Sequence, residues 1–456
     1  MKPELQSYYE LCTTEGNVVK ECRDGAEHIY IPEGIVEIAM GAFRNCIKLK
    51  RITLPSTLRR IGDGAFSFTG LSEISIPEGV EHVGMSAFSF TEAERIYLSS
   101  SVTFIGDGAF SSCALLREIA VASENSRYKS ENGVLYTKNG DALLQYPAGA
   151  CEKKFTVPSS VKRIGCYAFA DCKSIESITL PETLTFIDRY AFGGASRLKK
   201  IDLPRGLTAL CDGAFSFCTS LKSLLIPGGV SEIGLYACRG AAKLEDVVIE
   251  NGVSKIGTGA FEHCVSLTGI TLPASVREIC DKAFYWCRSL VNIELGGNVE
   301  YIGSQAFDLC TSLVRVDIPS SVRYIGINAF FGCSALSSVS FGDGELYLDE
   351  ASFSSCTSLV GIDLPIGLSH IGDYAFSECD ALRAITVPST VSHIGVCAIS
   401  CNAGSVTFAE CSGWYYADDE DDTDGVQIPP ELLRADAAAT LRQYSANYLK
   451  RKTNDE

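Results

Sequence analysis

Apolar residues along this chain recur in a fixed order that repeats every 22 or 23 residues. One copy has the form Leu-x-x-Ile-x-Leu-Pro-x-x-Val-x-x-Ile-Gly-x-x-Ala-Phe-x-x-Cys, as in the stretch from Leu267 to Cys287. The alternation in Ile-x-Leu predicts a short strand with both apolar side chains facing inward, and the Pro ends that strand. The Val-x-x-Ile-Gly segment predicts a second short strand on the opposite side, with Gly at a tight corner.

The last segment, Ala-Phe-x-x-Cys, predicts a short helical turn. Phe and Cys are three residues apart, so both would face inward on such a turn. An Asp often stands three residues before the Phe, where its carboxylate could cap the turn. The positions with this Asp are Asp63, Asp107, Asp212 and Asp373.

The length of the repeat is measured most clearly at its Phe position. Its occupants are Phe43, Phe66, Phe88, Phe110, Phe169, Phe192, Phe215, Cys238, Phe261, Phe284, Phe307, Phe330, Phe353, Phe376 and Ile399. From Phe169 to Ile399 every step is 23 residues, whereas the step from Phe110 to Phe169 is 59, or 23 plus 36. A fixed period of this size is typical of a solenoid, in which stacked coils bury an apolar face that no single coil could bury. We therefore expect an α/β repeat solenoid of about 15 coils with a parallel sheet, on the order of 70 Å long at about 4.8 Å per coil.

Composition and charge reduce the classes of partner and location that are open to this chain. The formal net charge of -17 disfavours nucleic acid and anionic membranes as partners. No apolar run reaches the roughly 18 residues of a membrane span. The N-terminal residues Met-Lys-Pro-Glu-Leu-Gln-Ser contain no apolar segment of a signal peptide, so the sequence by itself favours a cytoplasmic location.

Half of the 20 cysteines occupy one repeat position, three residues after the Phe. Three interpretations are open: free thiols packed as small apolar groups, disulfides between coils, and a metal site. Packing is favoured, because side chains in one column run parallel and do not converge on a partner or a metal. The members of this column are Cys46, Cys113, Cys172, Cys218, Cys264, Cys287, Cys310, Cys333, Cys356 and Cys379.

These three elements, Ile-x-Leu-Pro, Val-x-x-Ile-Gly and Ala-Phe-x-x-Cys, resemble the BspA-like (type-5) leucine-rich repeats of bacterial proteins over about residues 27–410. The resemblance implies an elongated leucine-rich-repeat solenoid without enzymatic activity. It also implies a surface or secreted protein that takes part in adhesion or host-protein binding.

Three segments depart from the repeat. Residues 1–26 are expected to form an N-terminal cap, because an open solenoid end needs protection. The excess within residues 122–156 contains Asn132-Gly133 and Asn139-Gly140 between apolar runs, which predicts a projecting β-hairpin. Residues 411–456 begin with an acidic loop, and helical spacing from Glu431 to Lys450 predicts a C-terminal capping helix with Arg451 and Lys452 at its end.

Two columns of outward residues are candidate binding sites. One directly precedes the Ile of the second strand and consists of Tyr301, Tyr324, Tyr347, His370 and His393, where coils nearer the N-terminus carry Glu232, Lys255 and Glu278. Stacked rings can form a recognition surface or simply stabilise the sheet. The other column lies on the first strand and contains Asp202, Glu294, Asp317 and Asp363, which is either an acidic recognition strip or a solvated polar face.

Metal binding and catalysis have little support. Glu420, Asp422, Asp424 and Glu431 partly match a calcium loop, although Pro429 and Pro430 interrupt it. The chain has five His and no nucleophile elbow, phosphate loop or zinc motif. We therefore expect a monomeric, non-enzymatic protein without cofactor that recognises another protein. The alternatives are a carbohydrate-binding surface and a purely structural spacer rod.

Overall fold

The computed structural model describes residues 3–399, 405–420 and 425–452. It is a parallel β-solenoid of about 17 turns with few helices, which confirms the predicted fold class while exceeding the predicted number of coils by about two. The described chain divides into two compact units, residues 1–221 and 222–456, and each is described separately.

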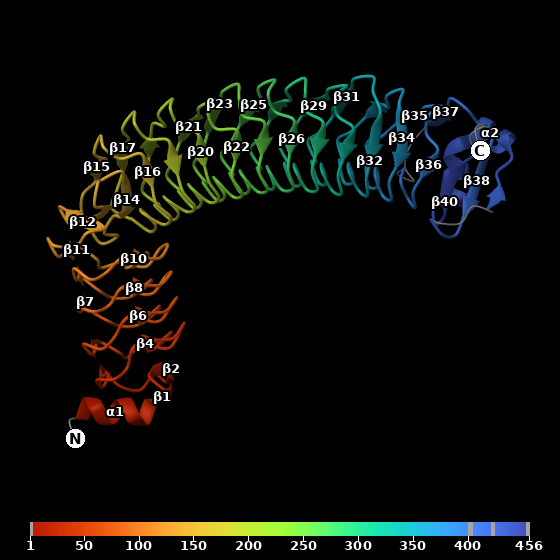
Figure 1. The fold of residues 1–456 in the computed structure, drawn as a ribbon. Helices are drawn as coiled ribbons and strands as arrows, with labels where there is room; N and C mark the ends of the chain where they lie inside the picture. The colour runs from red at the N-terminus through yellow and green to blue at the C-terminus, as the bar shows by residue number, and fades with distance from the viewer. Residues whose placement is uncertain (1–2, 400–404, 421–424, 453–456) are drawn as a thin grey trace. The chain divides into compact units, whose positions relative to one another are not determined.

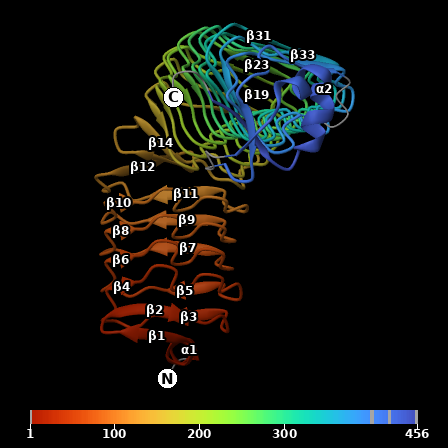
Figure 2. The same ribbon diagram turned by 90° about the vertical axis from the view of Figure 1, so that its right-hand side faces the viewer.

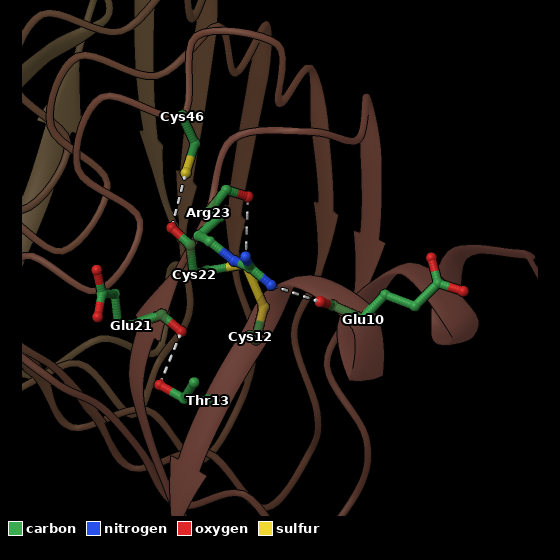
Figure 3. Close-up of a disulfide and its surroundings, with 7 residues drawn as sticks. All are labelled: Glu10, Cys12, Thr13, Glu21, Cys22, Arg23 and Cys46. Atoms are coloured by element: carbon green, nitrogen blue, oxygen red, sulfur yellow. Dashed lines mark hydrogen bonds between the residues drawn. A yellow bond between two sulfur atoms is a disulfide. The ribbon is translucent and has the colours of Figure 1, made fainter.

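The first unit begins with the helix α1 (Pro3–Leu11) and the antiparallel pair β1 (Cys12–Glu15) and β2 (Val18–Cys22). A disulfide joins Cys12 to Cys22 directly across this pair, and the carbonyl of Cys22 accepts the thiol proton of Cys46 from the first repeat coil (Figure 3). The repeat pattern did not predict this disulfide, because neither cysteine belongs to the repeat column.

Each following coil contributes a first strand and a second strand, which lie on opposite sides of the stack (Figure 2). The first strands form short parallel sheets of two or three strands each, and the second strands pair parallel in longer series. The first strands are β3 (His28–Tyr30), β5 (Arg51–Thr53), β7 (Glu73–Ile76), β9 (Arg95–Leu98), β11 (Glu118–Val121), β15 (Lys154–Thr156), β17 (Ser177–Thr179) and β19 (Lys200–Ile201). The second strands are β4 (Glu37–Ile38), β6 (Arg60–Ile61), β8 (His82–Val83), β10 (Phe104–Ile105), β14 (Ala142–Gln145), β16 (Arg163–Ile164), β18 (Phe186–Ile187) and β20 (Ala209–Leu210).

An antiparallel hairpin, β12 (Tyr128–Glu131) and β13 (Val134–Thr137), lies within the residues that exceed the repeat. The chain then rejoins the solenoid at β14, and Tyr146 occupies the place of the Phe. Its ring stacks on Phe169 at 5.2 Å, and its amide donates to the carbonyl of Ala168 as a Phe of the repeat would. The step of 59 residues is therefore one coil of 36 and one of 23, which accounts for one of the extra turns.

The second unit continues the same design as far as its end (Figure 1). Its first strands are β21 (Ser223–Ile226), β23 (Asp246–Ile249), β25 (Gly269–Thr271), β27 (Asn292–Glu294), β29 (Arg315–Ile318), β31 (Ser338–Phe341), β33 (Gly361–Asp363), β35 (Ala384–Val387) and β37 (Ser405–Phe408). Its second strands are β22 (Glu232–Ile233), β24 (Lys255–Ile256), β26 (Glu278–Ile279), β28 (Tyr301–Ile302), β30 (Tyr324–Ile325), β32 (Leu346–Leu348), β34 (Leu368–Ile371) and β36 (His393–Ile394).

The C-terminal end differs from the prediction of one long helix. It contains β38 (Trp414–Ala417), β39 (Val426–Gln427), the helix α2 (Pro430–Gln443) and β40 (Tyr448–Arg451). The helix ends at Gln443, so Arg451 belongs to a strand and not to a helix end. Strand β40 pairs antiparallel with both β36 and β38, and therefore supplies backbone partners to the last second strand that a helix could not supply.

The Ala-Phe-x-x-Cys segment is a pair of tight turns, so the prediction of a helical turn was wrong. Residues two before and two after the Phe have positive φ, for example Gln305 at 57° and Leu309 at 58° around Phe307. Two of the Asp residues that stand three before the Phe bond to the next coil. Asp63 accepts from the amide of Met85, and Asp373 from the amide of Val396, so these carboxylates join consecutive coils.

The core is a set of columns parallel to the stack. Phe284, Phe307 and Phe330 have no exposed surface, and their rings stack at 5.2 and 5.0 Å, close to the spacing of the coils. The Cys column is buried and reduced as expected from packing. Burial raises the pKa of the Cys287 thiol to about 12, so the column is not ionised at neutral pH.

Candidate functional site

Five rings of the second-strand column form a continuous stack along residues 301–393, here called the aromatic ladder. Parallel pairing places Tyr301 beside Tyr324, Tyr324 beside Tyr347, Tyr347 beside His370 and His370 beside His393. The corresponding ring centroids are 5.2, 5.8, 4.1 and 4.1 Å apart, with planes within 19° of parallel. Each ring therefore covers the face of the next.

The ladder is half-buried. Tyr301 at one end has 36% of its surface exposed, and the other four members are intermediate in exposure. At the opposite end His393 contacts Tyr448 of β40, with centroids 5.8 Å apart. Because the faces are stacked, it is the ring edges that meet solvent.

Hydrogen bonds and burial fix the protonation of these rings. The Tyr324 hydroxyl donates to Asp349, and burial together with this carboxylate raises the pKa of Tyr324. Burial, together with the neighbouring His393, lowers the pKa of His370 to about 4. Burial and Lys450 lower the pKa of His393 to about 4. At neutral pH the ladder is an uncharged aromatic strip.

Other coils fill the same column with matched charges. Lys255 lies 3.6 Å from Glu232 on one side and 3.6 Å from Glu278 on the other. In the first unit His82 stacks on Phe104 at 4.4 Å. The solenoid thus accepts either complementary charges or stacked rings here, and it does not require the aromatic series.

The predicted acidic column is exposed, and its carboxylates are partly neutralised. Asp317 pairs with Arg315 at 2.8 Å on the same strand, and Thr271 donates to Glu294. Ser340 lies between Asp317 and Asp363 in the column, so the acidic residues do not form an unbroken series. Asp202 lies in the first unit and pairs with Lys200 at 3.1 Å.

A further aromatic column was missed by the sequence analysis. It occupies the position two residues after the Phe, where the backbone has positive φ. Phe68 and Phe90 have φ of 59° and 57°, are 39% and 47% exposed, and stack at 4.5 Å. In the second unit His263 and Trp286 occupy this position 4.6 Å apart, and Arg288 lies over the Trp286 ring at 4.1 Å. Counting two residues forward from each Phe would have revealed the column.

The predicted calcium loop falls partly outside the described residues, because it includes Asp422 and Asp424. Glu420 and Glu431 are exposed, and the carbonyl of Glu420 accepts from Lys450. Across the part of the chain that the structure describes, no cluster of three or more His, Cys, Asp or Glu could hold a metal.

Comparison with known proteins identifies the repeat. The family model of the BspA type leucine rich repeat region matches in six copies, over residues 17–132, 149–268, 231–360 and 277–405. The chain belongs to the BspA-type leucine-rich repeat family. Proteins of this family are generally protein-binding or adhesion-type surface proteins and are typically not enzymes. No curated protein matches the chain significantly.

Solved structures of bacterial leucine-rich repeat proteins resemble the chain. A leucine-rich repeat protein of Eubacterium ventriosum is 26% identical, with a TM-score of 0.54 over 70% of this chain and 91% of that one. A leucine-rich repeat protein of Bacteroides ovatus is also 26% identical, with a TM-score of 0.50 over 86% and 87% of the two chains. A leucine rich cell surface protein of Faecalibacterium prausnitzii has 26% identity and a TM-score of 0.42 over 64% and 95%. No described helix is long and apolar enough to cross a membrane.

Proposed function

We propose that this BspA-type protein recognises a protein partner through the edges of the aromatic ladder, without catalysis or a cofactor and as a monomer. The observation that carries the proposal is the unbroken stack from Tyr301 to His393, at positions where neighbouring coils carry Glu232, Lys255 and Glu278. Rigid aromatic side chains supply contact area at little entropic cost, because their rotamers are already fixed. Here the stacking fixes them before a partner arrives.

A protein partner fits this surface better than a carbohydrate does. Sugars pack on open ring faces, whereas the faces in the ladder are covered by the neighbouring rings at 4.1–5.8 Å. Ring edges and the tyrosine hydroxyls suit the mixed apolar and polar surface of a protein. We include the exposed carboxylates of Glu294, Asp317 and Asp363 in the proposal as a second surface, suited to basic side chains.

A structural rod is the competing function, and mutation separates it from recognition. Replacing both Tyr324 and Tyr347 by Ala removes three ring pairs, each contributing about 0.5–1.5 kcal/mol. The milder variant Tyr301→Ala removes one ring pair at the exposed end. The matched control, Glu232→Ala with Lys255→Ala, alters the same column without touching a ring.

The experiment immobilises each variant and compares the proteins captured from host and bacterial surface extracts. We expect specific partners to be lost with Tyr301→Ala and with the double tyrosine variant, and to be kept by the charge control. Circular dichroism checks that each variant is folded. Specific partners that all variants capture equally would exclude the ladder as the binding surface, and no specific capture by any variant would support the rod.

We also propose that the protein works in an oxidising compartment, as a surface protein would. The Cys12–Cys22 disulfide in the N-terminal cap supports this, since cytosolic thiols are kept reduced. Non-reducing peptide mapping of the protein from its natural source tests the point. Free thiols at both positions would contradict it.

A further inference from the structure

The coil that contains the hairpin departs from the repeat at several core positions. The alignment of this coil with the next one is fixed on both sides of the turn that follows Tyr146. The Tyr146 amide donates to the carbonyl of Ala168 at 2.8 Å, and Phe155 pairs with Ile178. Counting from Tyr146 in place of the Phe, Gly149 stands at the Cys position and Glu152 at the Leu position. Phe155 stands where most coils have Ile.

Glu152 differs from its counterparts in exposure. The equivalent residues in the two adjacent coils, Leu116 and Ile175, are 0% and 1% exposed, whereas Glu152 faces solvent. A pocket of about 420 Å³ lies beside it. Volumes of 300–1,000 Å³ with an apolar lining are usual for ligand sites. The pocket is lined by Arg117, Asn132, Val134, Tyr146, Pro147, Gly149, Ala150, Cys151, Glu152 and Phe155.

The lining combines an aromatic wall with a polar rim. The rings of Tyr146 and Phe155 meet edge to face, with centroids 4.8 Å apart, and Val134 of the hairpin is buried next to them. The Tyr146 hydroxyl donates to Oε2 of Glu152 over 3.2 Å. Arg117 also lines the pocket, so one basic and one acidic residue accompany the apolar wall.

We propose that this pocket binds a phenol ring. A third ring can pack edge to face on Tyr146 and Phe155, which an aliphatic group cannot do. Glu152 has further lone pairs to accept the phenol proton, and Arg117 can donate to the phenol oxygen. The opposite charges of these two residues favour a neutral ligand over a charged one. This site is separate from the aromatic ladder and does not depend on the function proposed for it.

The test uses 4-fluorophenol as the probe and its fluorine NMR signal as the readout. Glu152→Leu restores the residue type of the repeat, removes the acceptor and fills the opening. We expect this variant to be at least as stable as the natural chain and to bind the probe at least tenfold more weakly. The control Glu182→Leu changes another exposed Glu and should bind as before. Phe155→Ile, which restores the usual aliphatic residue, should also weaken binding.

Two ligands distinguish whether the bound phenol ring belongs to a protein partner or to a small molecule. Binding of N-acetyl-L-tyrosinamide as well as 4-fluorophenol would indicate a tyrosine side chain of a partner, and binding of the free phenol alone would indicate a small molecule. The exposed thiol of Cys151 gives an independent readout, because an occupied pocket should slow its alkylation. Failure of 4-fluorophenol to bind at millimolar concentration, or equal binding by Glu152→Leu, would overturn the proposal.

Discussion

The Cys310 thiol donates a hydrogen bond to the main-chain carbonyl oxygen of Phe284 in the preceding coil, with 3.2 Å between sulfur and oxygen. The same contact recurs along the column. Its other instances include Cys218 to Phe192, Cys287 to Phe261, Cys333 to Phe307, Cys356 to Phe330 and Cys379 to Phe353. The column therefore gives a hydrogen-bond donor to a buried carbonyl in each of these coils, in addition to filling space.

Replacing Cys310 by Ala should therefore destabilise the protein by about 1–3 kcal/mol, because the carbonyl of Phe284 loses its partner and a small cavity forms. Cys310→Ser, which retains a donor, should cost less. Thermal unfolding of the two variants tests this. If the Ser variant proved the less stable of the two, packing and not hydrogen bonding would be the main role of the thiol.

Truncating a central Phe should be more damaging than truncating the first one. Phe307 stacks on Phe284 and on Phe330, whereas among the described residues the first-coil Phe43 stacks on Phe66 alone. Phe307→Ala should cost about 3–5 kcal/mol as a core truncation. Calorimetry of both Ala variants should show the larger loss for Phe307. Negligible losses at both positions would contradict a stacked core.

The thiols of the column should resist alkylation in the native protein. Burial raises the pKa of Cys287 and Cys379 to about 12, so at pH 8 only about one thiol in ten thousand would be ionised. Iodoacetamide followed by peptide mass spectrometry should modify the exposed Cys151 first and the column only after denaturation. Rapid native labelling of Cys287 would show that the column opens.

Acid should destabilise the end of the aromatic ladder. The folded-state pKa values of His370 and His393 are about 4, below the usual 6.5, so the unfolded chain binds these protons more readily. Stability should thus be complete above pH 6.5 and decline as the pH falls towards 4. The double variant His370→Phe with His393→Phe, which preserves stacking, should show a smaller fall in melting temperature between pH 7 and pH 4.5. An unchanged fall would assign the acid sensitivity to other groups.

The architecture could be predicted from the sequence, because a Phe that recurs every 23 residues can be buried in every coil only if the coils stack in parallel. It could not identify Tyr146 as a member of the Phe column, since the turn before it is two residues shorter than in neighbouring coils. The separation from the paired strand residue shows this difference: Leu143 precedes Tyr146 by three residues, and Ile164 precedes Phe169 by five.

The contacts between coils could not be predicted from the sequence either. Asp63 resembles a helix cap locally, yet its partner is the amide of Met85, 22 residues later. The pair Phe68 and Phe90 could have been located by counting from the Phe, but their exposure and positive φ required the structure, since large aromatic residues rarely adopt positive φ. The ladder could be located by counting from the Phe, but its half-burial and covered ring faces required the structure.

Photo-crosslinking tests the central claim, that the ladder edges contact a partner. p-Benzoylphenylalanine in place of Tyr301 keeps an aromatic ring at the exposed end of the ladder, and the same group in place of Ile366 samples the turn between β33 and β34, where Ile366 is 72% exposed. We predict that a captured partner is crosslinked from position 301 and not from position 366. A partner that binds both proteins equally but is crosslinked only from position 366 would contradict recognition through the ladder.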